Sequence, residues 1–224
     1  AANFPFCTID PNIGVVDVVD ERLDFLSKLS KSKKKIYTNI TFVDIAGLVK
    51  GASKGEGLGN KFLSHIREVD AIIHLVRCFE SDKITHVNSK IDPVNDLETI
   101  KTEIMLSDID IIQKKLEKGK KKLLNEKEIE ILEKKLEQLN QNKDAAINNE
   151  SENKFLSTVG LLSIKPKIIV CNVDEGSLAK GNKFTESIKS KYPHEKIVYI
   201  CADIEDQIMG LDKNEKETFM KEIG

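Results

Sequence analysis

The sequence predicts a doubly wound α/β fold with a mostly parallel sheet and an inserted α-helical coiled-coil hairpin. Three continuous apolar runs are rich in Ile and Val and lead into polar residues: 71–76, 168–173 and 197–202. Such runs are typical of parallel strands that are covered on both faces, here by the intervening helical stretches. Ligands of such sheets bind at the carboxyl ends of the strands. We therefore expect Asp44, Asn172 and Cys201 to face one crevice.

The stretch 40–59 runs from an apolar strand into Asp-Ile-Ala-Gly at 44–47 and then into a glycine-rich loop. At the end of a buried strand, the Asp44 carboxylate can hold a water molecule of Mg²⁺, and Gly47 lets a backbone N–H approach a terminal phosphate. The pattern therefore indicates a nucleotide switch. Asp-x-x-Gly also occurs in ordinary turns, and the pattern alone fits that interpretation equally well.

Two later strand ends carry residues that fit loops for a nucleotide base. The first reads Asn-Val-Asp-Glu from Asn172 to Glu175, and the second begins with Cys201 and Ala202. In a GTPase the first loop reads Asn-Lys-x-Asp, and its final carboxylate accepts two guanine N–H groups. Here Val173 replaces the lysine, and Glu175 is one methylene longer than aspartate, so a bidentate contact with guanine is not assured. Taken singly, such residues are turn residues that end a strand, but their order favours a base site.

The chain resembles the Obg-like ATPases of the YchF group, which are P-loop NTPases of the translation-factor class that prefer ATP. The resemblance begins at NFPFCTIDPN (3–12) and continues through VDIAGLVKGASKGEGLGNKFLSHIRE and VRCFES to the Asn-x-x-Glu loop and the final Cys-Ala pair. It covers nearly the whole chain. It implies a P-loop NTPase-type sheet and a switch protein that hydrolyses ATP with Mg²⁺ as its cofactor.

The resemblance also implies roles for individual residues. Thr8 would lie in switch I as a ligand of Mg²⁺, and Asp44 and Gly47 would form switch II, with Asp44 acting on the metal. The expected nucleotide-binding residues at the base are Asn172, Val173, Glu175, Cys201 and Ala202.

The family's Gly-x-x-x-x-Gly-Lys-Ser loop is not found in this sequence, which begins just after the helix that would follow it. The amides, lysine and hydroxyl of that loop bind phosphates and Mg²⁺, so we expect the sequence as it stands to bind nucleotide poorly and to be inactive alone. The family's C-terminal TGS domain would follow Gly224. We therefore expect this chain to be the central part of a longer protein.

Many GTPases place a water-orienting glutamine after Asp-x-x-Gly, and that position is Leu48 here. Hydrolysis would then need another polar group, K⁺ or a partner in trans. The resemblance implies that His86, in a polar loop after an apolar run, is the catalytic residue that positions water. A surface-loop histidine is the alternative. His65 and His74 are weaker candidates, and a hydrogen-bonded core histidine is the simpler interpretation of His74.

Between 97 and 139 the sequence becomes rich in Lys and Glu, and Gly119 provides a turn between two helices. Each arm would extend roughly 30 Å, and charged side chains would face outward. The family has an insertion here, which implies docking to the ribosome; a solvated structural arm is the alternative. The apolar residues that follow helical spacing are Leu97, Ile100, Ile104, Ile111, Ile129, Leu132, Leu136 and Leu139.

We divide the chain into a nucleotide-binding domain, 1–95 with 154–224, and an inserted hairpin with its linker, 96–153. The polar stretch 140–153 is typical of a linker. From Lys154 the pattern is amphipathic, and Pro166 is expected to stop that helix before the next strand.

Composition narrows the possible partners and location. The formal net charge of -2 predicts no bulk affinity for polyanions, and the lysine runs at 31–35 and 115–122 favour solvated faces over RNA contacts. No stretch is apolar enough to span a membrane, so we expect a cytoplasmic protein without membrane or sequence-specific DNA partners. Zinc is not indicated, because the cysteines lie far apart, and three of them fit buried strand positions. The four are Cys7, Cys78, Cys171 and Cys201.

The leading prediction is an Mg²⁺-dependent ATPase of the Obg-like family that acts with the ribosome. One alternative is a GTPase with relaxed base choice, in which GTP would bind as well. The other is a nucleotide-independent module that binds ribosomes or other proteins through the hairpin.

Overall fold

The computed structural model describes residues 12–45, 58–81, 91–119, 124–143, 149–212, 215–216 and 218–219. The chain forms two compact units, 1–47 and 48–224, and each is described by itself. Five residues singled out above lie outside the described residues: Cys7, Thr8, Gly47, Leu48 and His86.

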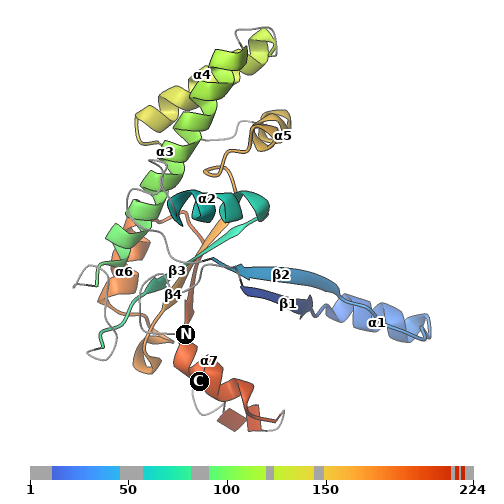
Figure 1. The fold of residues 1–224 in the computed structure, drawn as a ribbon. Helices are drawn as coiled ribbons and strands as arrows, with labels where there is room; N and C mark the ends of the chain where they lie inside the picture. Colours follow the sequence, from blue (N-terminus) through green and yellow to red (C-terminus); the bar gives the residue numbers. More distant parts are fainter. Residues whose placement is uncertain are drawn as a thin grey trace. The chain divides into compact units, whose positions relative to one another are not determined.

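The first unit is a β-hairpin with a helix at its turn. Strand β1 (Asn12–Val18) pairs antiparallel with β2 (Thr38–Asp44), and α1 (Glu21–Leu29) lies between them in sequence (Figure 1). Helix α1 begins where the Asp20 carboxylate accepts the Arg22 backbone N–H at 2.9 Å, which satisfies a free helix donor.

Strand β2 differs from the sequence prediction. We expected a buried strand before Asp44, but the side chains of Ile40 and Phe42 are 50% and 45% exposed. The strand pairs antiparallel with β1, whereas the three strands of the second unit form a separate parallel sheet. Among the described residues of the first unit, β2 has β1 as its strand neighbour. A two-stranded hairpin leaves much of each face open, so side chains of β2 are exposed.

The second unit contains the predicted parallel sheet. Strands β3 (Ile72–Arg77), β4 (Lys167–Asn172) and β5 (Ile197–Ile200) are parallel and lie in the order β3-β4-β5. The register aligns Arg77 with Asn172, and Asn172 with Ile200. Because all three strands end at one level, the loops that follow them meet at the same edge of the sheet.

One face of this sheet packs against helices α3 (Pro93–Gly119) and α6 (Lys183–Lys191). The buried cluster there includes Leu97, Ile169 and Ile188. We predicted cover on both faces, but Ile73 and Leu75 on the other face are 49% and 61% exposed. Side chains alternate along a strand, so the described helices bury one set and leave the other at the surface.

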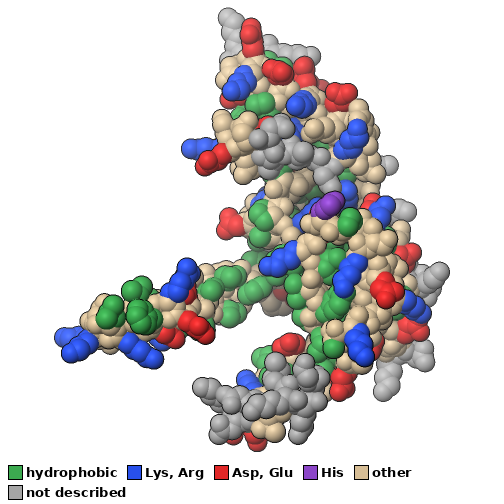
Figure 2. All heavy atoms as spheres, turned by 180° about the vertical axis from the view of Figure 1, so that it is seen from behind, with side chains coloured by type: hydrophobic (Ala, Val, Ile, Leu, Met, Phe, Trp, Pro, Cys, Tyr) green, Lys and Arg blue, Asp and Glu red, His purple; other side chains and the backbone are tan. Residues whose placement is uncertain are grey.

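The predicted helical hairpin is present and consists of α3 and α4 (Glu126–Asn140). Helix α3 ends at Gly119, as the sequence indicates, and a side chain there would collide with Leu124. Helix α4 begins with a capping box between Asn125 and Glu128. Acidic and basic side chains are interspersed over the hairpin surface (Figure 2). Its core is apolar and includes Met105, Ile112, Leu116, Leu132 and Leu139.

Helix α5 (Glu150–Val159) begins and ends earlier than the sequence indicates. The Asn149 side chain accepts the Glu152 N–H and starts the helix inside the predicted linker. Gly160 ends it with φ of 84°, a left-handed conformation that favours glycine, so the helix stops well before Pro166. None of the described helices is long and apolar enough to cross a membrane.

Helix α2 (Leu58–Glu68) is tied to the start of β4. The Lys165 ammonium donates to the carbonyl oxygens of Ile66 at 2.9 Å and Arg67 at 2.8 Å, and also to that of Val69. These are carbonyls at the helix end, where a cation is favoured. Two short elements complete the unit: the 3₁₀-helix η2 (Glu175–Ser177) and helix α7 (Ala202–Met209).

Candidate nucleotide-binding site

The structure brings together four of the predicted base-site residues where β4 and β5 end. The Ala202 backbone N–H donates to Asn172 Oδ1 at 3.0 Å, and the Val173 N–H donates to the Ile200 carbonyl at 2.8 Å. The Asn172 carbonyl accepts the Cys78 N–H at 2.7 Å, which adds the end of β3. Asn172 therefore connects the ends of all three strands.

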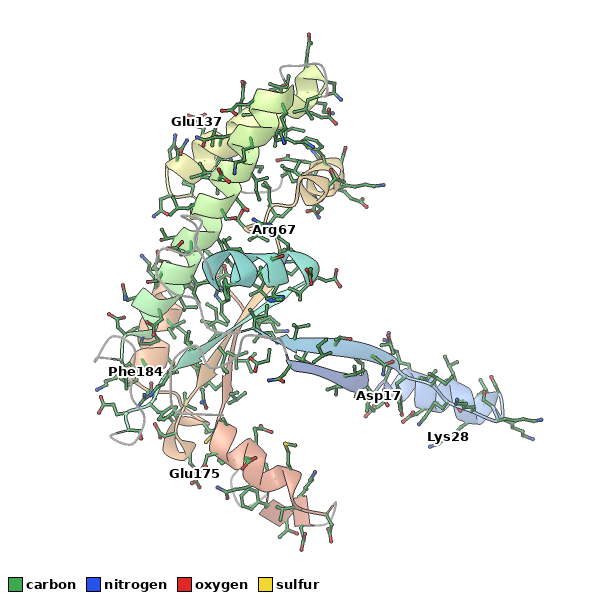
Figure 3. The ribbon with its side chains drawn as sticks, viewed as in Figure 1. Asp17, Lys28, Arg67, Glu137, Glu175 and Phe184 are labelled. Carbon is green, nitrogen blue, oxygen red and sulfur yellow. The ribbon has the colours of Figure 1, made fainter. Side chains whose placement is uncertain are left out.

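Some of these residues are buried and others are accessible to solvent. Val173 and Cys201 are buried, at 2% and 4% exposure, whereas Ala202 lies at the surface as the first residue of α7. Glu175 is exposed in the loop that follows β4 (Figure 3). The accessible groups are thus an amide, a carboxylate and the surface of Ala202.

The loop between Asn172 and α6 is held by hydrogen bonds of its own. The Ser177 hydroxyl lies 3.0 and 2.9 Å from the two carboxylate oxygens of Asp174, and the Ser177 N–H donates to the Asp174 carbonyl at 3.0 Å. Glu175 lies between these two residues as the first residue of η2. The backbone on both sides of Glu175 is therefore fixed.

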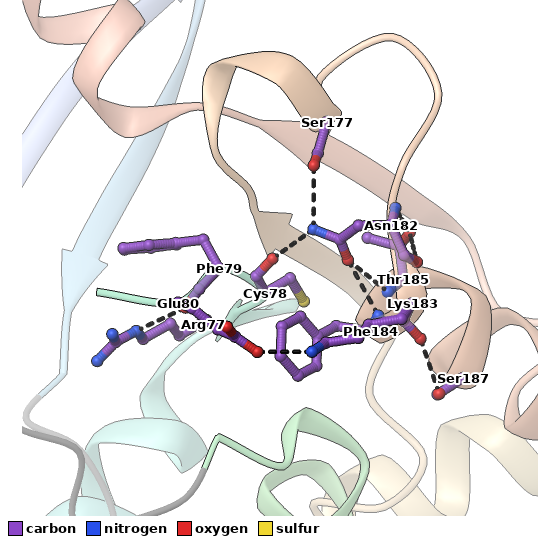
Figure 4. A network of polar contacts seen from close by, with 10 residues as sticks. All are labelled: Arg77, Cys78, Phe79, Glu80, Ser177, Asn182, Lys183, Phe184, Thr185 and Ser187. Atoms are coloured by element: carbon purple, nitrogen blue, oxygen red, sulfur yellow. Dashed lines mark hydrogen bonds and ion pairs between the residues drawn. The ribbon is translucent and has the colours of Figure 1, made fainter. Parts of the chain in front are cut away.

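Asn182 supports this loop and was not among the residues predicted from the sequence. Its Nδ2 donates to the Cys78 carbonyl at 2.7 Å and to Ser177 Oγ at 3.2 Å (Figure 4). Its Oδ1 accepts the N–H groups of Phe184 and Thr185 at 3.0 and 3.2 Å. An Asn directly before an amphipathic stretch is a helix-start signal, but it gives no indication of the contact with Cys78.

The segment that follows β3 is also fixed by side chains. Arg77 donates from Nε to the Phe79 carbonyl and from Nη2 to the Ser81 carbonyl, both at 3.1 Å. Its guanidinium also lies over the Phe79 ring, 4.8 Å from the centroid. At the surface, Lys183 forms an ion pair with Glu80 at 2.6 Å.

The cysteines near the site are buried, as the sequence predicts. Cys78 and Cys171 are fully buried and Cys201 nearly so. The hydrogen bond with the Cys171 thiol, and then burial, raises the pKa of the Cys78 thiol far above its usual range. Because the thiolate is the reactive form, Cys78 acts here as a small apolar side chain.

Asp44 lies at the end of β2 and is exposed, opposite Asn12 in the hairpin. It belongs to the first unit, so its predicted convergence with Asn172 and Cys201 stays a prediction. Among the described residues, no group of three His, Cys, Asp or Glu side chains could hold a metal ion. Mg²⁺ at a phosphate site needs only one or two protein oxygen ligands, and an exposed carboxylate meets that requirement.

The two described histidines that we considered lie in α2 and β3. His65 is in the last turn of α2. His74 lies within β3 and is partly buried, which confirms a core position, but its Nε2 has no hydrogen-bond partner among the described residues. Burial lowers the pKa of His74 to about 4, and the nearby Lys167 charge adds to this effect. His74 is therefore neutral at pH 7.

The sequence and the fold are similar to those of known proteins. The ribosome-binding ATPase YchF of Bacillus subtilis (strain 168) is 45% identical over 236 residues, covering 100% of this chain and 64% of that protein. The ribosome-binding ATPase YchF of Escherichia coli O157:H7 is 43% identical over 233 residues, with the same coverage. The structure of the Schizosaccharomyces pombe YchF GTPase matches with a TM-score of 0.80 and 33% identity, covering 99% of this chain and 64% of that one.

The chain thus spans just under two thirds of the length of these relatives. The family described as "50S ribosome-binding GTPase" matches residues 1–173, which include the strands β1 to β4 and the hairpin. The resemblance predicted from the sequence is confirmed, and so is the P-loop NTPase-type α/β fold with its parallel sheet. The chain belongs to the family of 50S ribosome-binding GTPases and, within it, to the YchF group.

Proposed function

We propose that the protein is an Mg²⁺-dependent ATPase of the YchF group, and that its switch loops report the state of the bound nucleotide to the ribosome. The observation that carries this proposal is the arrangement at the strand ends, where Asn172 holds the backbone of Ala202 and the exposed Glu175 begins the 3₁₀-helix that follows β4. The names of the relatives from Bacillus subtilis and Escherichia coli, which are ribosome-binding ATPases, support the same activity. Because a protein that acts with ribosomes has to meet them in the cytoplasm, the proposal includes a cytoplasmic location.

The chemistry of the base site favours adenine. Adenine presents an amino donor beside a ring-nitrogen acceptor. The Nδ2 group of Asn172 is suited to donate to the ring nitrogen, while the Glu175 carboxylate accepts from the amino group. Val173 and Cys201 are buried beneath these groups, and Ala202 borders the base. Two features separate this loop from a guanine-binding loop: Val173 in place of the lysine, and the longer side chain of Glu175.

The residues for phosphate and metal follow from the family. Thr8 and Asp44 would hold Mg²⁺, which neutralises charge on the phosphates when it is bound. Gly47 would let a backbone N–H reach the terminal phosphate, and His86 would orient the water that attacks it. Leu48 stands where many GTPases have glutamine, so the proposal gives this role to His86, with K⁺ as a second candidate for charge compensation.

The test compares ATP and GTP in the full-length protein. Titration calorimetry with Mg²⁺ present should give tighter binding of ATP, and hydrolysis should release phosphate faster from ATP. Glu175→Asp should shift the ratio of the two affinities toward GTP, because the shorter carboxylate matches the guanine contact. Lys180→Ala, at an exposed residue in the same connection, is the control. A clear preference of the unchanged protein for GTP would replace ATP with GTP in the proposal.

A second function rests on the hairpin, which we propose as a docking arm for the ribosome. Its apolar core keeps α3 and α4 together, and acidic and basic side chains are interspersed over its surface. We also propose the division of the chain into 1–95 with 154–224 and the insertion 96–153. If the protein binds no nucleotide, the arm would still bind the ribosome, and the protein would be a nucleotide-independent binding module.

Ribosome co-sedimentation tests the arm without removing it. Lys115→Glu with Lys118→Glu reverses charge at two exposed positions of α3 and should reduce binding to RNA-rich particles. Lys154→Glu reverses an exposed charge outside the two hairpin helices and serves as the control. Unchanged co-sedimentation of the double variant would assign ribosome binding to another surface.

A further inference from the structure

The side-chain amide of Asn182 has no remaining hydrogen-bonding capacity. An amide offers two donors and an oxygen with two acceptor sites. Both donors of Asn182 are used, by the Cys78 carbonyl and Ser177 Oγ, and both acceptor sites are used, by the N–H groups of Phe184 and Thr185. A helix cap requires only the acceptor half of this arrangement. The donor half must therefore be explained by the elements that it joins.

Those elements are the end of β3, the 3₁₀-helix η2 and the start of α6. The contact with the Cys78 carbonyl spans 104 positions in the sequence, so it joins distant segments and is no local turn. The Cys78 N–H in turn donates to the Asn172 carbonyl at 2.7 Å. Asn182 and Asn172 thus both contact Cys78, the residue that follows β3.

Ser177 extends the contact from Asn182 to the residue before Glu175. Its hydroxyl is within hydrogen-bond distance of Asn182 Nδ2 and of both carboxylate oxygens of Asp174. Ser177 is 9% exposed, so water competes little for the hydrogen bonds of this hydroxyl. The chain of contacts from Asn182 through Ser177 to Asp174 ends one residue before Glu175.

The far side of the loop is fixed as well. The Gly181 N–H donates to the Ser177 carbonyl at 2.7 Å, and Gly181 has φ of 75°. A Cβ at Gly181 would lie 2.5 Å from Thr185 Oγ1, so a residue with a side chain does not fit there. The loop is therefore closed by backbone geometry as well as by the Asn182 amide.

We infer that Asn182 and Ser177 are positioning residues for the nucleotide base: they hold the loop so that the Glu175 carboxylate meets the base edge. Neither residue contacts the base, and both act through Asp174 and the backbone of η2. This inference rests on the proposed function, because it assigns the base contact to Glu175. It predicts that damage to these contacts weakens recognition of the base and spares recognition of the phosphates.

The experiment measures ATP and inorganic tripolyphosphate binding to the full-length protein by titration calorimetry with Mg²⁺. Ser177→Ala should weaken ATP binding about tenfold, as expected for a lost positioning hydrogen bond, and leave tripolyphosphate binding within about twofold. Asn182→Asp retains the acceptor that caps α6 but replaces both donors, so it should show the same selective loss. Ser187→Ala removes an exposed α6 hydroxyl that donates to the Lys183 carbonyl, and it serves as the control.

The outcomes separate this inference from the function on which it rests. If the unchanged protein binds ATP no more tightly than tripolyphosphate, the base site is absent and both proposals fail. If the unchanged protein prefers ATP and Ser177→Ala binds both probes as tightly as before, only the inference fails. An equal loss for ATP and tripolyphosphate would show that Ser177 supports the fold in general, which also overturns the inference.

Discussion

Asn172 Oδ1 accepts the backbone N–H of Ala202 at 3.0 Å, across 30 positions of sequence. The bond satisfies the first N–H of α7, whose N-cap residue Cys201 provides no side-chain acceptor. The amide oxygen of Asn172 is therefore structural, while its Nδ2 group is the part assigned to the base. The proposed function thus gives this side chain two roles on two different atoms, and the two can be tested separately.

The first prediction separates these two atoms. Asn172→Asp keeps an acceptor for the Ala202 N–H but loses the donor, so ATP affinity should fall. The free energy of unfolding in urea should stay within about 0.5 kcal/mol of that of the unchanged protein. Asn172→Ala loses both groups and should also lower the free energy of unfolding by about 1–3 kcal/mol. Equal ATP affinity for Asn172→Asp and the unchanged protein would show that Nδ2 does not contact the base.

The second prediction concerns a buried ion pair in the helical part of the second unit. The Lys135 ammonium, in α4, is fully buried and lies 2.9 Å from Glu152 Oε1, in α5. Glu152→Gln should lower the free energy of unfolding by about 3–5 kcal/mol, because it leaves a buried charge without its counter-ion. Lys135→Met combined with Glu152→Leu should recover most of that loss. Additive losses in the double variant would contradict this account.

The third prediction is a pH dependence from His74. The pKa of about 4 in the folded protein lies below the ordinary value of 6.5, so between these pH values the unfolded chain binds a proton that the folded protein does not. Stability should therefore fall as the pH is lowered from 6.5 to 4, by about 3 kcal/mol in total from this group. His74→Gln removes the titrating group. The difference in the free energy of unfolding between the unchanged protein and this variant, measured in urea, should therefore narrow as the pH is lowered from 6.5 to 4. A constant difference would rule out His74 as the source.

The fourth prediction concerns the Asp108 carboxylate, which is fully buried in α3. It accepts the backbone N–H groups of Leu162 and Ser163, both at 2.8 Å, and so attaches α3 to the segment that leads into β4. Asp108→Ala leaves two donors without partners, and the thermal midpoint should fall by an amount that corresponds to about 2–4 kcal/mol. Asp110→Ala, at an exposed carboxylate of the same helix, should have little effect. Similar losses in both variants would contradict a specific role for Asp108.

Much of the second unit could be predicted from the sequence because its signals are local. The apolar runs of β3, β4 and β5 indicate parallel strands, and the structure confirms them. Gly119 ends α3 as predicted, and the buried state of Cys171 follows from its place within an apolar run. Asn172 and Ala202 lie at strand ends, which the fold brings together, and a hydrogen bond joins them; their role at a base stays a prediction.

Some of the remaining features depend on contacts between distant segments, and one, the end of α5, depends on a local backbone conformation. The same apolar pattern describes a covered strand and an exposed one, so the exposure of Phe42 in β2 could not be foreseen from it. The left-handed Gly160 ended α5 before the expected proline. Asn182 fits a simple helix cap in the sequence, and its donor contact with Cys78 depends on a pairing over 104 positions. The predicted roles of Thr8, Gly47 and His86 stay predictions.

The enclosure of Lys135 between α4 and α5 also decides how this protein behaves toward amine-reactive reagents. Exposed lysines such as Lys114 will react with succinimidyl esters in the native protein, whereas an ammonium without solvent access will not. Covalent labelling at Lys135, detected by mass spectrometry, therefore reports the fraction of molecules in which α5 has separated from α4. Cross-linking maps of a complex should show the outer lysines of the hairpin and leave Lys135 unmodified, which provides an internal standard for the integrity of the arm.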